Sequence, residues 1–176
     1  IEIMGKIKRS LLKSFLNTDP TKTGGQEKWA LINKGVTSQK FQYNPETTTE
    51  TYIGEDSATT SVDSYKVSVQ TPMTAFKGDP IFEYVDALRK KRAVGEDCET
   101  QLLVVNAYDK QTDGSFSAEL NQVTIQITEF GADGGKPLEA PFTIALNGDP
   151  VYGTVTFEAN GAAKFKKATT APGIGG

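Results

Sequence analysis

The sequence predicts a mainly β domain, a β-sandwich or partial barrel, with one flanking α-helix. Segments with apolar residues at every second position recur along the chain, as in strands that bury one face. Helical periodicity is convincing only over about residues 80–92, and a long polar loop at 44–63 interrupts the strands. A chain of 176 residues can form one domain with a substantial core, which we place at 1–168.

The first strands are expected before the polar loop. Residues 6–18 are loosely amphipathic and fit either a short helix or a strand, and their Ser and Thr residues favour the strand. A short apolar strand is expected over 29–32. The next strand is expected over 36–43, where Phe41 and Tyr43 alternate with polar residues.

The helix over 80–92 has clear signals at both ends. Asp79 is a suitable N-cap, and Pro80 fits the first helical position because its missing N–H would have no partner there. Gly95 is expected to end the helix. The basic run 89–92 complements the negative end of the helix dipole, with nucleic-acid contact as the minor alternative. The predicted buried face comprises Ile81, Val85 and Leu88.

The remaining strands are separated by recognisable turns. Asp113-Gly114 and Asn160-Gly161 are hairpin signals. Residues 102–105 form a continuous apolar run, typical of a strand that is covered on both faces. The small, Gly-rich tail at 169–176 is expected to be loose. We expect these strands over 64–70, 102–108, 115–120, 122–130, 142–147, 155–157 and 163–165.

The loop at 44–63 is rich in Thr and Ser, carries five carboxylates and has no positive charge. A loop of this length inside a compact domain is usually functional or disordered. We interpret it as an extended arm that packs on a neighbouring subunit, with a solvated acidic loop as the alternative. The residues expected to make this contact are Thr48, Thr49, Tyr52, Ile53, Glu55 and Asp56.

Several strands have an unusual polar face. These faces carry hydroxyls and amides, whereas an ordinary solvent face carries more Glu and Lys of mixed sign. The alternative is plain β-propensity, since Thr suits strands anyway. The residues out of phase with the core are Ser38, Gln42, Ser68, Gln70, Gln122, Thr124 and Gln126.

The residues that usually carry catalysis are scarce. Histidine is absent, which removes the commonest general base and metal ligand. The single cysteine, Cys98, stands between Asp97 and Glu99, whose carboxylates disfavour a thiolate. The net charge of −3 argues against a nucleic-acid binder, and no apolar run is long enough to cross a bilayer. We expect no enzymatic activity, metal or cofactor.

Three segments resemble the major tail tube proteins of long-tailed bacteriophages, particularly those that infect Gram-positive bacteria. They are 6–16 (KIKRSLLKSFL), 43–57 (YNPETTTETYIGEDS) and 78–95 (GDPIFEYVDALRKKRAVG), followed by the acidic bridge into 102–105. The resemblance covers roughly 6–158. Lys40 and Lys66 depart from the family, whose channels tend to be neutral to acidic.

The resemblance implies a β-sandwich subunit of hexameric rings that stack into a tube, with the inner strands forming a barrel around a channel for DNA. The seven polar-face residues would then line the lumen, and the loop at 44–63 would reach the adjacent ring or subunit. The implied partners are further copies of the chain, the tape measure, distal tail and terminator proteins, and transiently DNA. The implied location is the virion tail, assembled in the host cytoplasm. A β-sandwich binding module, such as a carbohydrate-binding domain using Trp29 and Tyr52, is the alternative.

Overall fold

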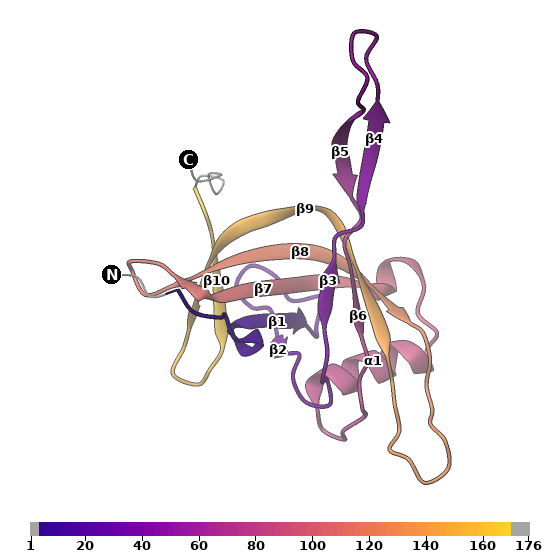
Figure 1. Cartoon of the computed structure of the whole chain (residues 1–176). Helices are drawn as coiled ribbons and strands as arrows, with labels where there is room; N and C mark the ends of the chain where they lie inside the picture. The colour runs from indigo at the N-terminus through magenta and orange to yellow at the C-terminus, as the bar shows by residue number, and fades with distance from the viewer. Residues whose placement is uncertain (1–3, 170–176) are drawn as a thin grey trace.

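The computed structural model describes residues 4–169, so most of the C-terminal tail at 169–176 lies outside the described residues. One antiparallel sheet has the strand order β2-β1-β7-β8-β9-β6-β3, with β10 paired to β9, and β4 and β5 form a separate hairpin (Figure 1). The strands are β1 (Leu12–Asn17), β2 (Trp29–Leu31), β3 (Lys40–Gln42), β4 (Pro45–Glu50), β5 (Thr59–Tyr65), β6 (Ser68–Thr71), β7 (Glu99–Lys110), β8 (Phe116–Ile127), β9 (Phe142–Phe157) and β10 (Ala163–Lys167). The helix is α1 (Pro80–Lys90), and short 3-10 helices are η1 (Arg9–Leu11) and η2 (Gly95–Cys98). The expected fold class, mainly β with one flanking helix, is confirmed.

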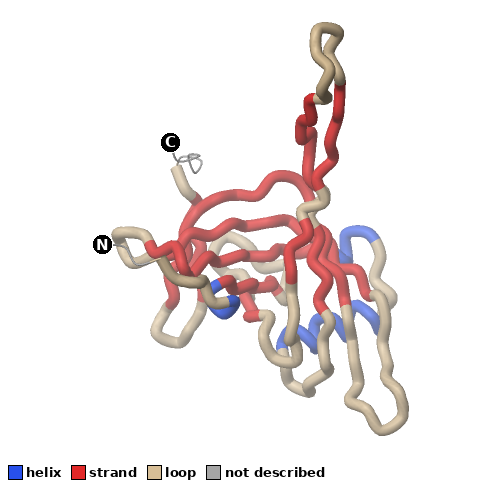
Figure 2. The backbone as a smooth tube through the Cα atoms, in the orientation of Figure 1, coloured by secondary structure: helices blue, strands red, loops and turns tan. Residues whose placement is uncertain are grey.

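The long strands β8 and β9 bend the sheet. Leu120 pairs with Val151 and Gln122 with Asn147, so three residues of β9 lie opposite the single residue Asn121 of β8. Extra residues of this kind bend a strand and increase its twist, and β9 arcs visibly over the body (Figure 2). The sheet therefore has two halves, β2-β1-β7 with β10 at one end and β6-β3 at the other, that share β8 and β9.

The main core lies on one side of this bent sheet. It joins the helix face that the sequence predicts, Ile81, Val85 and Leu88, to buried residues of both halves. Leu102 and Leu16 come from the first half and Val69 from the second, and all three are fully buried. Because α1 packs against residues of both halves, it holds the bend closed.

A second core lies on the other side of β7. Leu103 and Val105 pack there with Phe15 and with residues of β9 and β10. Gly153 permits the close approach of β10, since a Cβ at that position would lie 2.2 Å from the carbonyl oxygen of Lys166. The prediction that the 102–105 run is covered on both faces is confirmed, because its four residues alternate between the two cores.

The helix begins as the sequence predicts but ends earlier. The Asp79 carboxylate accepts a hydrogen bond from the Phe82 N–H at 3.4 Å. The helix ends at Lys90, before the expected residue 92, and Gly95 does not end it but begins η2. Arg92 instead adopts the left-handed conformation, with a φ of 46°. The Arg92 N–H bonds to the Arg89 carbonyl and the Ala93 N–H to the Leu88 carbonyl, which is the Schellman pattern with arginine in the usual glycine position.

Several strand predictions were inaccurate at their boundaries. The strand expected over 36–43 is regular only over Lys40–Gln42, because Gly35 bonds to the Thr74 N–H and turns the chain, and Gln39 is buried against Thr71. The strand expected over 64–70 is divided between β5 and β6. The strands expected over 115–120 and 122–130 are one strand, β8, with the bulge between them. The strands expected over 142–147 and 155–157 are likewise one strand, β9.

Replacing Leu88 with Ala should lower the free energy of unfolding by about 2–5 kcal/mol, because Leu88 is 4 % exposed within the main core. Chemical denaturation measures the loss. The exposed helical residue Ala87 provides the control, since Ala87→Ser should change stability by no more than about 0.5 kcal/mol. A similarly small loss for Leu88→Ala would contradict the packing described for α1.

Replacing Arg92 with Gly should raise the free energy of unfolding by about 0.5–1 kcal/mol, because glycine adopts the left-handed conformation without steric cost. Chemical denaturation measures this gain in the free energy of unfolding. Arg92→Ala retains the unfavourable backbone conformation and should give no such gain. Equal effects of the two substitutions would show that Arg92 carries no backbone strain.

Candidate assembly surfaces

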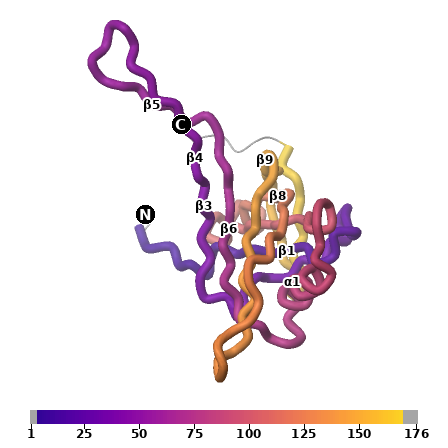
Figure 3. The backbone as a smooth tube through the Cα atoms, turned by 90° about the vertical axis from the view of Figure 1, so that its right-hand side faces the viewer, coloured from indigo at the N-terminus to yellow at the C-terminus, as the bar shows by residue number. Residues whose placement is uncertain are grey.

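The segment expected as a long loop is a β-hairpin that projects from the body. We call residues 45–65, comprising β4, β5 and the turn between them, the arm. Every residue of the arm is exposed, and Figures 1 and 3 show it extending away from both halves of the sheet. An isolated two-stranded hairpin is marginally stable in water. The arm therefore lacks, within its own chain, the apolar support that strands normally have.

Cross-strand hydroxyl contacts give the arm its regular part. The Thr49 and Thr60 hydroxyls lie 3.0 Å apart, and the Thr48 hydroxyl donates to the Asp63 carboxylate. Thr48 and Thr49, two of the six residues predicted to contact a neighbour, thus lie on β4. Their side chains are short and polar, so this part of the arm stays soluble while it remains unpaired.

The other four predicted contact residues form the tip. The Glu55 N–H bonds to the Tyr52 carbonyl at 3.0 Å and closes a turn that presents Ile53 at its apex. Ile53 is 109 % exposed and Tyr52 55 %. Burying an isoleucine side chain is worth about 1.5–3 kcal/mol. Tip residues Glu55 and Asp56 add two exposed carboxylates beside this apolar pair.

A polar clamp fixes the base of the arm. Asn44 has a φ of 43°, and its side-chain amide donates to the Lys66 carbonyl at 3.0 Å. The Lys66 ammonium pairs with Glu46 at 2.8 Å. These contacts lie where the chain leaves β3 and returns to β6, which explains why the strand expected over 64–70 is broken there.

The register of the sheet brings six of the seven predicted polar-face residues together. They lie on the side of β3, β6 and β8 that faces away from α1 and the main core, and we call this surface the polar face. Ser38 is the exception, because it is exposed in the loop before β3. The paired residues of the polar face form three rows across the sheet. The first row is Lys40, Gln70, Thr143 and Gln126. The second is Gln42, Ser68, Ala145, Thr124 and Glu99, and the third is Asn147, Gln122 and Gln101.

Strand β9 supplies the centre of the polar face, which the sequence analysis did not assign. Thr143, Ala145 and Asn147 alternate with the core residues Phe142 and Ile144, the same signal that identified the other members. The Asn147 amide donates to the Thr124 hydroxyl at 2.8 Å and ties β9 to β8. The face is therefore a continuous surface of hydroxyls and amides, with charges only towards its margins.

A patch of four tyrosines lies near the base of the arm. Tyr43 and Tyr65 meet edge to face at 6.3 Å between ring centroids, and Tyr108 and Tyr152 lie close to Tyr43. Burial and the nearby Glu119 carboxylate raise the pKa of Tyr43. Burial likewise raises the pKa of Glu119, which pairs with Tyr152 across β8 and β9. Sequence reasoning missed this patch because its members come from β5, β7, β9 and the segment that follows β3.

Replacing Glu119 with Gln should stabilise the fold increasingly as pH rises. The folded state raises the pKa of this carboxyl above its ordinary 4.5, so the native protein loses stability as pH rises through the folded pKa. Glutamine has no such titration. The difference in unfolding free energy between variant and native protein should grow from acidic to neutral pH. A difference that does not change with pH would show that the carboxyl stays hydrated in the fold.

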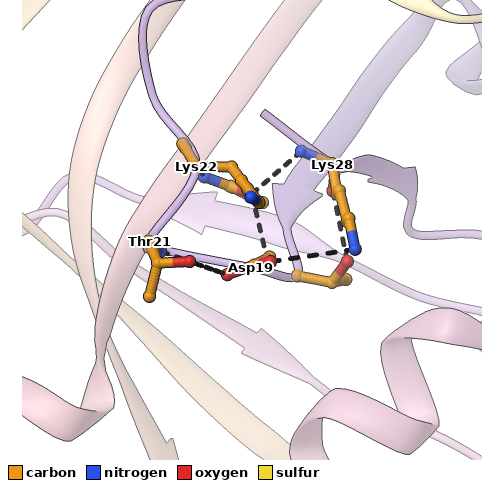
Figure 4. Close-up of polar contacts among 6 residues, drawn as sticks. Asp19, Thr21, Lys22 and Lys28 are labelled. Atoms are coloured by element: carbon orange, nitrogen blue, oxygen red, sulfur yellow. Dashed lines mark hydrogen bonds and ion pairs between the residues drawn. The ribbon is translucent and has the colours of Figure 1, made fainter. Parts of the chain in front are cut away.

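Other polar clusters have structural roles. In the β1–β2 loop the Thr21 hydroxyl donates to the Asp19 carboxylate at 2.5 Å and Lys28 lies 3.7 Å from it, contacts that lower the pKa of Asp19 (Figure 4). The Cys98 thiol donates to the Ala93 carbonyl and caps the turn after α1. Across residues 4–169, no group of three or more acidic, Cys or His residues is placed to hold a metal ion.

Trp29 and Tyr52 do not form the aromatic platform that a carbohydrate-binding module would need. Trp29 packs against the second core, whereas Tyr52 lies at the tip of the projecting arm. In the part of the chain that the structure describes, no helix has the length and apolar character needed to cross a membrane.

No protein-family profile matches the sequence, and no curated protein matches it. Solved structures do match in fold. A chain from the tail of an empty GTA particle, determined with helical refinement and C6 symmetry, has 13 % identity and a TM-score of 0.57 over 84 % of this chain and 98 % of that chain. A chain from the six-fold symmetrised baseplate of the anti-feeding prophage has 9 % identity and a TM-score of 0.44 over 80 % and 89 % of the two chains, a likeness too slight to carry an argument. The protein thus has the fold of a subunit found in a six-fold symmetric tail.

Proposed function

We propose that this protein is a structural subunit of a bacteriophage tail tube, in which hexameric rings stack around a channel for DNA. The observation that carries the proposal is the arm, a fully exposed hairpin with an apolar tip that its own chain leaves unsupported. The fold shared with a chain of a C6-symmetric tail supports it, as do the sequence segments that resemble tail tube proteins.

In this proposal the arm is the assembly element. Its contact residues Thr48, Thr49, Tyr52, Ile53, Glu55 and Asp56 bury against a neighbouring copy, where the tip gains the apolar contacts it lacks in the single chain. The 21 residues of the arm reach roughly 30 Å as a hairpin, about the diameter of a small domain. An arm of that length is long enough to cross into an adjacent subunit.

The polar face lines the channel in the assembled tube. Its six members from the original set, together with residues of β9, offer hydrogen-bonding groups that water satisfies and few cations that would bind phosphate. Lys40 lies at the edge strand of this face, and Lys66 is neutralised by Glu46. Edge strands β3 and β2 then pair or pack with neighbours, which removes exposed strand edges.

The remaining partners follow from the same proposal. The tube ends meet tape measure, distal tail and terminator proteins, and DNA passes through without specific binding. The tube belongs to a phage of the type that infects Gram-positive bacteria, is assembled in the host cytoplasm and resides in the virion tail. The subunit acts by shape and surface chemistry and catalyses no reaction.

Shortening the arm should abolish assembly without unfolding the subunit. Because Thr47 pairs with Val62, replacing residues 48–61 with Asn-Gly closes the hairpin with a favourable two-residue turn. The variant should retain the circular dichroism spectrum of the body and remain monomeric in analytical ultracentrifugation, while the native chain forms tubes in electron micrographs. Normal tubes from the shortened variant would exclude the arm as the assembly element.

Placing arginines on the polar face should retain DNA in the channel. Gln122 and Gln126 are both exposed, whereas Thr124 is tied to Asn147, so Gln122→Arg with Gln126→Arg adds charge with little structural cost. Rings of these cations along the path of a polyanion should impair DNA delivery by particles with normal tails. Gln122→Thr with Gln126→Thr is the uncharged control and should deliver normally. Normal delivery by the arginine variant would place this face outside the channel.

A further inference from the structure

A groove lies at the C-terminal end of α1, in the body of the molecule and away from the arm tip (Figure 1). It has a volume of about 950 Å³ and lies between the last turn of the helix, the η2 segment and the end of β8, where it meets the edge of the polar face at Thr124 and Gln126. We call it the helix-end groove. Its apolar lining comprises Leu88, Ala93, Val94, Ile125 and Ile127. Val94 is 77 % exposed, so the groove presents apolar surface to solvent.

One wall of the helix-end groove is basic. Arg89 lies 2.7 Å from Asp86 and stacks on the Phe130 ring, and Lys90 shares the same carboxylate at 3.0 Å. The single Asp86 carboxylate therefore forms ion pairs with both Arg89 and Lys90. Arg92, which also lines the groove, makes no ion pair among residues 4–169. Glu96 and Glu99 form part of the other wall, so the positive charge is concentrated on the helix side.

Arg92 also occupies the left-handed position that glycine would fill more favourably. Strained backbone that persists in a structure is common where a side chain has a role. Here the left-handed residue that ends the helix is an arginine that lines an apolar groove. Within residues 4–169, the Arg92 guanidinium has no ion-pair partner.

The arm tip has the complementary chemistry. It offers an exposed isoleucine and tyrosine beside two carboxylates, and no basic residue lies between 44 and 63. We propose that the arm tip of one copy, residues 51–58, docks in the helix-end groove of a second copy, with Ile53 against the apolar lining and Glu55 and Asp56 towards Arg92 and Lys90. This inference rests on the proposed assembly function and names its receptor surface.

The placement of the two surfaces favours contact between copies over contact within one. In Figures 1 and 3 the tip stands at the upper extreme of the molecule while α1 lies in the lower half of the body, so the tip does not reach the groove of its own chain. The arm tip and the helix-end groove are different surfaces, so their contact is head-to-tail. A head-to-tail contact leaves one free tip and one free groove, to which further copies can be added. Such a contact is the one that stacked rings need.

Charge reversal tests the pairing. Lys90→Glu with Arg92→Glu should raise the concentration needed for tube assembly about tenfold or more, which corresponds to about 1.4 kcal/mol per contact. Glu55→Lys with Asp56→Lys should do the same, and combining all four changes in one chain should restore assembly. Arg92→Gly should weaken assembly although it stabilises the monomer, which separates an interface effect from misfolding. If both double variants fold but the fourfold variant does not recover assembly, the proposed contact between the arm tip and the helix-end groove is wrong.

Cross-linking tests the position directly. In a Cys98→Ala background, cysteines at Ile53 and Val94 should be joined between chains by a short bis-maleimide once tubes form, while cysteines at Ile53 and Leu138 should not. Leu138 is also exposed and lies outside the groove, which makes it the matched control. Normal tubes without a 53–94 link would overturn the groove assignment and leave the assembly function standing. If neither the Cys98→Ala parent nor the native protein forms tubes, both the groove assignment and the proposed assembly function are wrong.

Discussion

The pairing of β8 with β9 is the interaction on which the rest of the structure depends. These two strands run through both halves of the sheet, and the three-against-one mismatch at Asn121 turns the sheet between them. Alternation places Phe116, Ala118 and Leu120 against the second core and Gln122, Thr124 and Gln126 on the polar face, all on the same side of β8. The same side of β8 is therefore apolar where β10 covers it and polar where no strand covers it.

This division explains how a small subunit can carry two kinds of surface. The main core and α1 support the sheet directly behind the polar face, so the polar face does not need to contribute to folding. Under the proposed function, substitutions on the polar face can meet the requirements of a channel without loss of fold stability. The arm is similarly independent, because it leaves the body at the Asn44 clamp and adds no side chain to either core. In the proposed assembly, the stability of the subunit and the affinity between subunits therefore depend on separate residues, except at the end of α1.

Periodicity predicted the local structure well. The buried face of α1 and the six sheet positions of the polar face follow from helical spacing and alternation, because the core selects one face of these elements. The 102–105 part of β7 follows from its continuous apolar run, because both of its faces are covered. The end of α1 was placed too late because Arg92 takes the position that glycine usually fills. The arm was expected as a loop because its strands carry Thr and Glu and show no apolar alternation.

The surfaces made by distant segments were beyond sequence reasoning. The tyrosine patch and the helix-end groove each combine residues from segments that lie far apart in the sequence. Ser38 was grouped with the polar face on the strength of alternation alone, yet Gly35 turns the chain away and leaves Ser38 outside the strand. Periodicity identifies which side of an element is polar, whereas tertiary pairing decides which polar sides join.

The central claim is that this subunit stacks into a tube by inserting its arm into a neighbour while its polar face surrounds the channel. Electron cryomicroscopy of tubes, assembled from the purified protein or recovered from particles, tests it most directly. The account predicts six-fold rings whose lumen is lined by the β3-β6-β9-β8 face, with ordered density for the arm against an adjacent copy. Tubes whose polar face points outward, or whose arms extend free into solvent, would contradict it.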